Sequence, residues 1–164
     1  MRPLTIQPAT DADIPIIEDI LLDVVAWLDA HDLHLWERQH VTWPELGKHY
    51  PIGTFHIACL DGVPVGCMAL LDHDPLFWPD VPAGRSLYIH KLAVKRAAAG
   101  QGVSQALIAH AKAQCAQRGI GELRLDCHQH RNKLRALYEA QGFVCVAEKR
   151  MFGQFDVAFY LCRL

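Results

Sequence analysis

Residues Leu92–Leu107 read LAVKRAAAGQGVSQAL. The segment Leu92–Val94 ends an apolar run typical of a β-strand, and Val103 opens a helical pattern. Between them, two glycines allow the backbone to approach an anion closely. The first amides of a helix lack intrahelical acceptors and point toward such an anion. The stretch therefore predicts a strand, a glycine loop and a helix that together bind a phosphate-bearing ligand.

The pattern on either side of this stretch predicts the remaining elements. Apolar residues at helical spacing predict helices over about 12–29, near 34–40, from Val103 to before Gly119, and over 133–141. We expect a loop through Trp43-Pro44 and Tyr50-Pro51. Strands are expected at 4–7, 54–60, 65–71, 87–94, 122–127, 143–149 and 155–162. This order mixes a hairpin with βαβ crossovers. It predicts an α/β (α+β) fold, with a single mixed, twisted seven-stranded sheet and helices on both faces.

Length and charge narrow the functional class. At 164 residues, the chain is expected to form a single domain over 1–164. A formal net charge of −2 gives no reason to expect nucleic acid or an anionic membrane as a partner. No apolar run reaches membrane-spanning length, and Met1–Ile6 does not have the pattern of a signal peptide. We therefore expect a cytoplasmic protein. The oligomeric state stays open, a homodimer included.

The cysteines and histidines do not form a metal-binding pattern. Six cysteines are scattered without a CxxC pair, which favours reduced thiols in the core. The segment Cys127–His130 is the one tight cluster, and no second ligand pair follows it at a zinc-like spacing. No metal is expected.

Two nucleotide-binding families do not fit the glycine loop. A dinucleotide-binding loop has a third glycine, and a nucleoside-triphosphate loop has a lysine after its last glycine. Here Val103 follows Gly102, and the loop lies past the middle of the chain. Both families are excluded.

The arrangement resembles the GNAT superfamily of N-acetyltransferases over essentially the whole chain. The central motif of that family is a strand with Leu-x-Val, then Gln/Arg-x-x-Gly-x-Gly/Ala opening a helix. Here Leu92-Ala93-Val94 ends the strand, and Ala99, Gly102 and Ser104 take the three motif positions. A second motif, Tyr-x-x-x-Gly-Phe, matches Tyr138–Phe143. Ala99 and Ser104 depart from the first pattern.

The resemblance implies acetyl-CoA, or another short acyl-CoA, as the acyl donor and co-substrate. It implies that neighbouring parallel strands splay apart, so that the backbone near Leu92 and Val94 bonds the pantetheine arm. It also implies that the helix N-terminus holds the pyrophosphate. The family's asparagine position is Arg131 here, with Asn132 next to it. The implied cofactor-binding residues are Leu92, Ala93, Val94, Ala99, Gly100, Gln101, Gly102, Val103, Ser104, Asn132 and Tyr138.

Acyl transfer to an amine needs a deprotonated amine, a stabilised oxyanion and a proton for the leaving thiolate. Tyr138 matches the family's general-acid tyrosine, although a tyrosine there could also pack in the core. His90 is a candidate base, because strict alternation places it on the strand face of Leu92. Asp126, at the end of the next strand, is a second candidate. Proton removal through water, without a dedicated base, stays open.

The acceptor pocket is expected in the least periodic segments, where aromatic and acidic residues gather. Aromatic rings beside carboxylates suit an amine with an apolar body, although rings at helical spacing are often part of a core. The candidate substrate-binding residues are Trp27, Trp36, Glu37, Trp78 and Tyr88.

The sequence thus predicts an acetyl-CoA-dependent N-acetyltransferase that acts on a primary amine, with a small molecule as the acceptor. The amine would attack the thioester directly in a ternary complex, since Cys127 is the only candidate nucleophile and is poorly placed. Two alternatives stay open. One is a non-catalytic acyl-CoA-binding regulatory module, and the other is an enzyme that acetylates protein N-termini or lysines.

Overall fold

The computed structural model describes residues 2–164. Its seven strands form one mixed sheet in the order β1-β2-β3-β4-β5-β7-β6, so the predicted fold class is confirmed. The chain divides into two compact units. The first unit holds the residues up to Leu70 together with His90–Leu107, and the second holds Leu71–Ile89 and Ile108–Leu164. A single domain over 1–164 stays a prediction.

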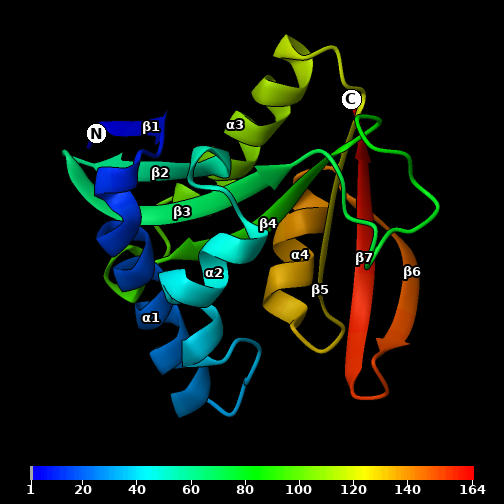
Figure 1. The fold of residues 1–164 in the computed structure, drawn as a ribbon, viewed down its shortest axis with the longest axis horizontal. Coiled ribbons are helices and arrows are strands. Elements are labelled where there is room, and N and C mark those ends of the chain that lie inside the picture. The colour runs from blue at the N-terminus through cyan, green and yellow to red at the C-terminus, as the bar shows by residue number, and fades with distance from the viewer. Residues whose placement is uncertain (1) are drawn as a thin grey trace. The chain divides into compact units, whose positions relative to one another are not determined.

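The helices and strands follow the predicted order closely (Figure 1). The strands are β1 Leu4–Pro8, β2 Phe55–Leu60, β3 Val63–Leu71, β4 Leu87–Val94, β5 Glu122–His128, β6 Val144–Met151 and β7 Phe155–Arg163. The helices are α1 Ile14–Ala30, α2 Trp43–His49, α3 Val103–Gln117 and α4 Asn132–Ala140. Short 3-10 turns lie at Asp11–Asp13, Arg38–His40, Ile52–Thr54 and Arg96–Ala98.

The second helix differs from the prediction. The segment near 34–40 contains only the turn Arg38–His40, and α2 forms where a loop through Trp43-Pro44 was expected. Pro44 lies in the first turn of α2, where a proline costs no hydrogen bond because the first amides have no intrahelical acceptor. The Glu18 carboxylate accepts a hydrogen bond from the Trp43 amide at 2.7 Å, which ties the start of α2 to α1.

In the first unit, helices cover both faces of the strands. The apolar stripe of α1 packs with α2 on one face of β2 and β3, and Figure 1 shows both helices beside these strands. On the other face, a Cβ built on Gly66 would lie 2.9 Å from Val103 and 3.3 Å from Leu107. Glycine at position 66 therefore allows the first turns of α3 to approach β3 closely.

In the second unit, β7 pairs antiparallel with both β5 and β6. The start of β4 runs parallel to β5, through the pairs Leu87–Leu123 and Tyr88–Arg124. The separation of these strands further along stays a prediction. One face of β7 carries Tyr160, whose ring lies 6.0 Å from that of Tyr138 on α4. The other face carries Phe159, and the loop before β4 packs there through Phe77 and Trp78.

The cysteines match the expectation of reduced thiols. All six are free, and five of them are buried, while Cys145 is half-buried. Among residues 2–164, no helix is both long and apolar enough to cross a membrane.

Candidate active site

The end of β4 in the first unit contains an irregularity that the sequence did not predict. Lys91 has a φ of +53°, a left-handed conformation that is uncommon outside glycine. His90 lies 5.4 Å from Tyr50, ring to ring, and Ala93 is packed in the α1–α2 core that Tyr50 borders. His90 and Ala93 therefore face the same side of the sheet. In a regular strand, side chains three positions apart face opposite sides, so the pleat is interrupted between them.

This irregularity corrects the expected position of His90. Because Ala93 faces the α1–α2 side, its neighbour Leu92 faces the opposite side. His90 and Leu92 thus lie on opposite faces of β4. The alternation rule failed because Lys91 interrupts the strand's pleat. A role for His90 as a base stays a prediction, but it no longer follows from a shared face with Leu92.

The glycine loop leads from β4 to α3 within the first unit. Gly100 and Gly102 have φ values of +78° and +81°, and a Cβ built on either residue would meet no protein atom within 4 Å. The Ala106 amide makes the first helical hydrogen bond of α3, 3.0 Å to the Gly102 oxygen. The amides of residues 103–105 precede that ladder and are available to an anion. Binding of a diphosphate by this loop stays a prediction.

The other predicted cofactor residues in this unit offer mainly backbone atoms. The side chains of Ala93 and Val103 are buried in the core, so only their main-chain groups can reach a ligand. Leu92, Val94 and Ser104 are half-buried, while Ala99 and Gln101 are exposed. A recognition site built from backbone groups tolerates alanine at position 99, where the family pattern has a long polar residue.

Tyr138 lies in α4 of the second unit, where it is 4% exposed. Its ring lies 6.0 Å from that of Phe143. Burial, reinforced by nearby Cys127 and Asp126, raises the pKa of the Tyr138 phenol far above its usual value of 10. The phenol is therefore fully protonated at neutral pH, the state that a proton donor needs.

Asp126 and Asn132 also belong to the second unit. Asp126 is half-buried and pairs across the ladder with Phe159, so its side chain points to the Phe159 face of the sheet. Tyr138 packs on the Tyr160 face, which means that the two predicted catalytic residues approach the sheet from opposite sides. Asn132 is exposed at the first position of α4.

Three predicted acceptor residues lie in the first unit, and each already has a partner within it. The guanidinium of Arg96 lies 4.0 Å from the centre of the Trp27 ring, and the ammonium of Lys91 lies 4.6 Å from the centre of the Trp36 ring. The exposed Glu37 carboxylate accepts a hydrogen bond from the Gln39 amide group at 2.7 Å. The two rings hold cations of the protein itself. Substrate contacts of these three residues stay predictions.

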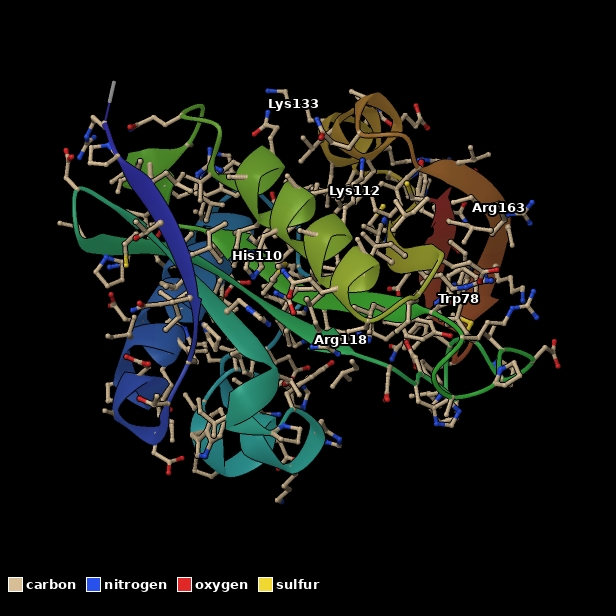
Figure 2. The ribbon with its side chains drawn as sticks, turned by 90° about the horizontal axis from the view of Figure 1, so that it is seen from above. Trp78, His110, Lys112, Arg118, Lys133 and Arg163 are labelled. Atoms are coloured by element: carbon tan, nitrogen blue, oxygen red, sulfur yellow. The ribbon has the colours of Figure 1, made fainter. Side chains whose placement is uncertain are left out.

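The other two predicted acceptor residues, Trp78 and Tyr88, lie in an apolar cluster of the second unit with Phe159. Trp78 is 8% exposed and Tyr88 is 1% exposed, so packing alone accounts for both rings. Trp78 is labelled in Figure 2. The guanidinium of Arg124 lies 4.8 Å from the centre of the Trp78 ring. Their contact with a substrate stays a prediction.

A polar network beside this cluster was not predicted from the sequence. Arg124 donates hydrogen bonds to the Ser86 hydroxyl at 2.9 Å and to the Glu122 carboxylate at 2.7 Å, and Ser86 donates to Glu122 at 2.8 Å. Burial favours the neutral acid, but these hydrogen bonds outweigh it and lower the pKa of Glu122. The sequence did contain a signal for this network, because Glu122 and Arg124 lie two positions apart in a strand and therefore share one face of the sheet.

No metal site is evident in the described part of the chain, residues 2–164, since no three His, Cys, Asp or Glu side chains come together as a ligand set. Within the tight cluster Cys127–His130, the ring centres of His128 and His130 lie 5.1 Å apart.

A comparison with curated protein sequences finds no match. Residues 20–143 match the acetyltransferase (GNAT) family. This match covers most of the chain, and the chain therefore belongs to the GNAT acetyltransferase family.

Several solved structures have the same fold. A GNAT-family acetyltransferase from Listeria monocytogenes 4b F2365 is 21% identical, with a TM-score of 0.78 over 98% of this chain and 95% of that one. The ribosomal-protein-S18-alanine N-acetyltransferase from Escherichia coli is 17% identical, with a TM-score of 0.73 over 98% and 94%. The PaiA N-acetyltransferase from Thermoplasma acidophilum, in complex with coenzyme A, is 15% identical, with a TM-score of 0.74 over 99% of both chains. At these identities, the likeness shows the fold alone.

Proposed function

We propose that this chain is an acetyl-CoA-dependent N-acetyltransferase that modifies a primary amine of a small molecule. The observation that carries the proposal is the loop with left-handed Gly100 and Gly102, which opens directly into α3. Membership of the GNAT acetyltransferase family supports the same chemistry. The two units would work as one catalytic domain over 1–164. The six free thiols favour a cytoplasmic setting.

In this proposal, the cofactor is held largely by backbone groups. The amides of residues 103–105 would bind the pyrophosphate, because positive φ at both glycines turns the chain so that successive N–H groups are available before the helix ladder begins. The backbone near Leu92 and Val94 would bond the pantetheine arm. The left-handed φ of +53° at Lys91 marks a departure from regular strand geometry directly before Leu92.

Bound acetyl-CoA would supply an acetyl thioester for direct attack by the amine in a ternary complex. Tyr138 would donate its phenolic proton to the departing thiolate. A backbone N–H near Leu92 would stabilise the oxyanion. His90, Asp126 or a water molecule would accept the proton of the amine.

A small-molecule acceptor is the finer part of the proposal. The aromatic rings of Trp36 and Tyr50 gather beside Lys91 in the first unit, and Tyr50 also lies beside His90. Aromatic rings gathered at one place suit a small amine with an apolar body. The first alternative is an open groove for a peptide, because one structure of the same fold is named as the N-acetyltransferase of an alanine in ribosomal protein S18. The second is a non-catalytic acyl-CoA-binding module, which the missing polar side chain at Ala99 favours.

The test is release of free CoA thiol from acetyl-CoA across a panel of small amines, peptides with free N-termini and lysine peptides, with products identified by mass spectrometry. Acetylation of small amines supports the proposal. Turnover on peptides alone would replace the small-molecule acceptor with a protein acceptor. Tight binding of CoA without turnover on any amine would identify a regulatory module instead.

A further inference from the structure

The exposed side of α1 carries three residues spaced four apart, Asp19, Asp23 and Trp27, and each contacts the beginning of the glycine loop. Residues four apart form a ridge along one side of a helix. The Asp19 carboxylate pairs with the Lys95 ammonium. The Asp23 carboxylate accepts a hydrogen bond from the backbone amide of Arg96 at 2.9 Å. Trp27 stacks on the Arg96 guanidinium.

We propose that this ridge, called here the α1 clamp (Asp19, Asp23 and Trp27), positions the glycine loop for the CoA pyrophosphate. The inference rests on the proposed function and extends it. It makes these three residues positioning residues, which touch the loop and not the cofactor. It also assigns Lys95 and Arg96 to anchoring, although cations beside a phosphate loop would ordinarily be taken as phosphate ligands.

The hydrogen bond from Arg96 to Asp23 is the central contact. Arg96 begins the 3-10 turn Arg96–Ala98. The side chain of the N-cap residue, Lys95, makes no capping hydrogen bond to this turn. The first amide of such a turn needs an acceptor from elsewhere, because no carbonyl of the turn can reach it. Asp23 supplies that acceptor as a carboxylate, and a charged acceptor makes the stronger kind of hydrogen bond.

Trp27 holds the same residue through its side chain. One face of the indole carries Arg96, and His31 stacks on the indole with ring centres 4.3 Å apart. The His31 ring is itself fixed, because its Nδ1 lies 2.8 Å from the Trp27 carbonyl oxygen. The indole is therefore held on its own helix and offers a rigid platform to the guanidinium.

The far end of the loop has a separate anchor in the same unit. Arg2 donates to the Gln101 side-chain oxygen at 3.1 Å and to the Asp61 carboxylate at 2.8 Å. Between the two anchors lie Ala99 and the left-handed Gly100, which have wide conformational freedom in an unrestrained chain. Fixing both ends lowers the entropy that remains to be lost when the loop orders around a phosphate.

The test measures the affinity for CoA by calorimetry at one fixed salt concentration, together with the steady-state constants. We expect Asp23→Asn to weaken CoA binding about fivefold, because the amide oxygen that remains is a neutral and therefore weaker acceptor than the carboxylate. Trp27→Leu should weaken it about two- to fivefold, with partial recovery in Trp27→Phe. The KM for acetyl-CoA should rise in proportion while kcat stays unchanged. Asp29→Asn is the matched control, because Asp29 lies on the same helix but bonds His34 instead of the loop.

Substitutions of Arg96 separate anchoring from phosphate binding. Lysine has no planar guanidinium group and cannot stack on Trp27 as arginine does. Arg96→Lys should therefore lose about as much CoA affinity as Arg96→Ala. The pair Trp27→Leu and Arg96→Ala should be non-additive, with the double variant within about twofold of Arg96→Ala alone. Full affinity in Arg96→Lys would identify a phosphate ligand and overturn the assignment.

The remaining outcomes are also decisive. Unchanged CoA affinity in folded Asp23→Asn and Trp27→Leu, with only a lower unfolding midpoint, would make the ridge a purely structural contact and refute the α1 clamp while leaving the proposed function intact. A wild-type protein that does not bind CoA would refute both. The isosteric Asp23→Asn and Trp27→Phe variants keep the test valid if Trp27→Leu fails to fold.

Discussion

Replacing Gly102 with valine tests the phosphate loop most directly. Gly102 has a φ of +81° and no protein atom within 4 Å of an added Cβ, so the substitution creates no clash with the protein itself. Valine nevertheless disfavours a left-handed backbone by about 1–2 kcal/mol. That strain either remains in the folded state or turns the chain away from the conformation that presents its amides. The added side chain also occupies the open space beside the loop.

The loss of stability and the loss of CoA affinity differ in size. Strain of about 1–2 kcal/mol lowers the melting temperature by roughly 2–8 °C in a chain of this length. A lost hydrogen bond from an amide to a charged phosphate costs about 1.5–3 kcal/mol, which corresponds to CoA binding about 10- to 100-fold weaker. Thermal unfolding measures the fall in melting temperature, and calorimetric titration with CoA measures the loss of affinity.

Gly119→Val is the matched control. Gly119 also has a left-handed backbone, with a φ of +67°, and also has no atom within 4 Å of an added Cβ, but it follows the end of α3. The Gly119→Val variant should lose about as much stability as Gly102→Val and keep full affinity for CoA. If Gly102→Val is folded and binds CoA as tightly as the wild type, the assignment of the pyrophosphate to this loop is wrong.

Three further predictions concern buried polar groups. Tyr138→Phe should lower kcat by at least about tenfold while CoA affinity and the unfolding midpoint stay unchanged; parallel losses of activity and stability would mark packing instead. Burial raises the pKa of the Cys67 thiol from 9.0 to about 12, so its contribution to stability is complete below pH 9 and is lost as the pH rises toward 12. Cys67→Ala should therefore reduce the decline of unfolding free energy between pH 9 and 11, measured by urea titration, by about 1.4 kcal/mol per pH unit, and an unchanged slope would contradict this. Glu122→Gln should cost about 2 kcal/mol in the same assay at pH 7, because it leaves the buried Arg124 without its carboxylate, and a cost near zero would show that the pair is replaceable.

The fold could be predicted from the sequence because its signals are local. Glycines with left-handed backbones mark the loop, the Gly142 turn ends α4, and Asp61-Gly62 connects β2 to β3. The helix α2 was missed because a proline was taken as a break, although it lies in the first helical turn, where it is tolerated. The same residue type has opposite effects at the start and in the interior of a helix.

The candidate site was predictable only in its backbone. The strand β4, the glycine loop and the helix α3 follow from the order of apolar residues and glycines. The positions of side chains relative to one another did not follow, because a single left-handed residue, Lys91, reverses the pleat between His90 and Leu92. Two of the aromatic residues expected around an amine stack on cations of the protein, Trp27 on Arg96 and Trp36 on Lys91, which the sequence did not predict.

The sequence by itself thus determined the succession of elements, the family and the position of the glycine loop, since periodicity and glycine positions act through neighbouring residues. Only the tertiary structure decided which groups face each other across long separations. The contact between Asp23 and Arg96 joins residues 73 positions apart in the chain. Local pattern carries no information about such a pair, because the packing of α1 on the sheet, and not the chain between them, brings the carboxylate to the amide.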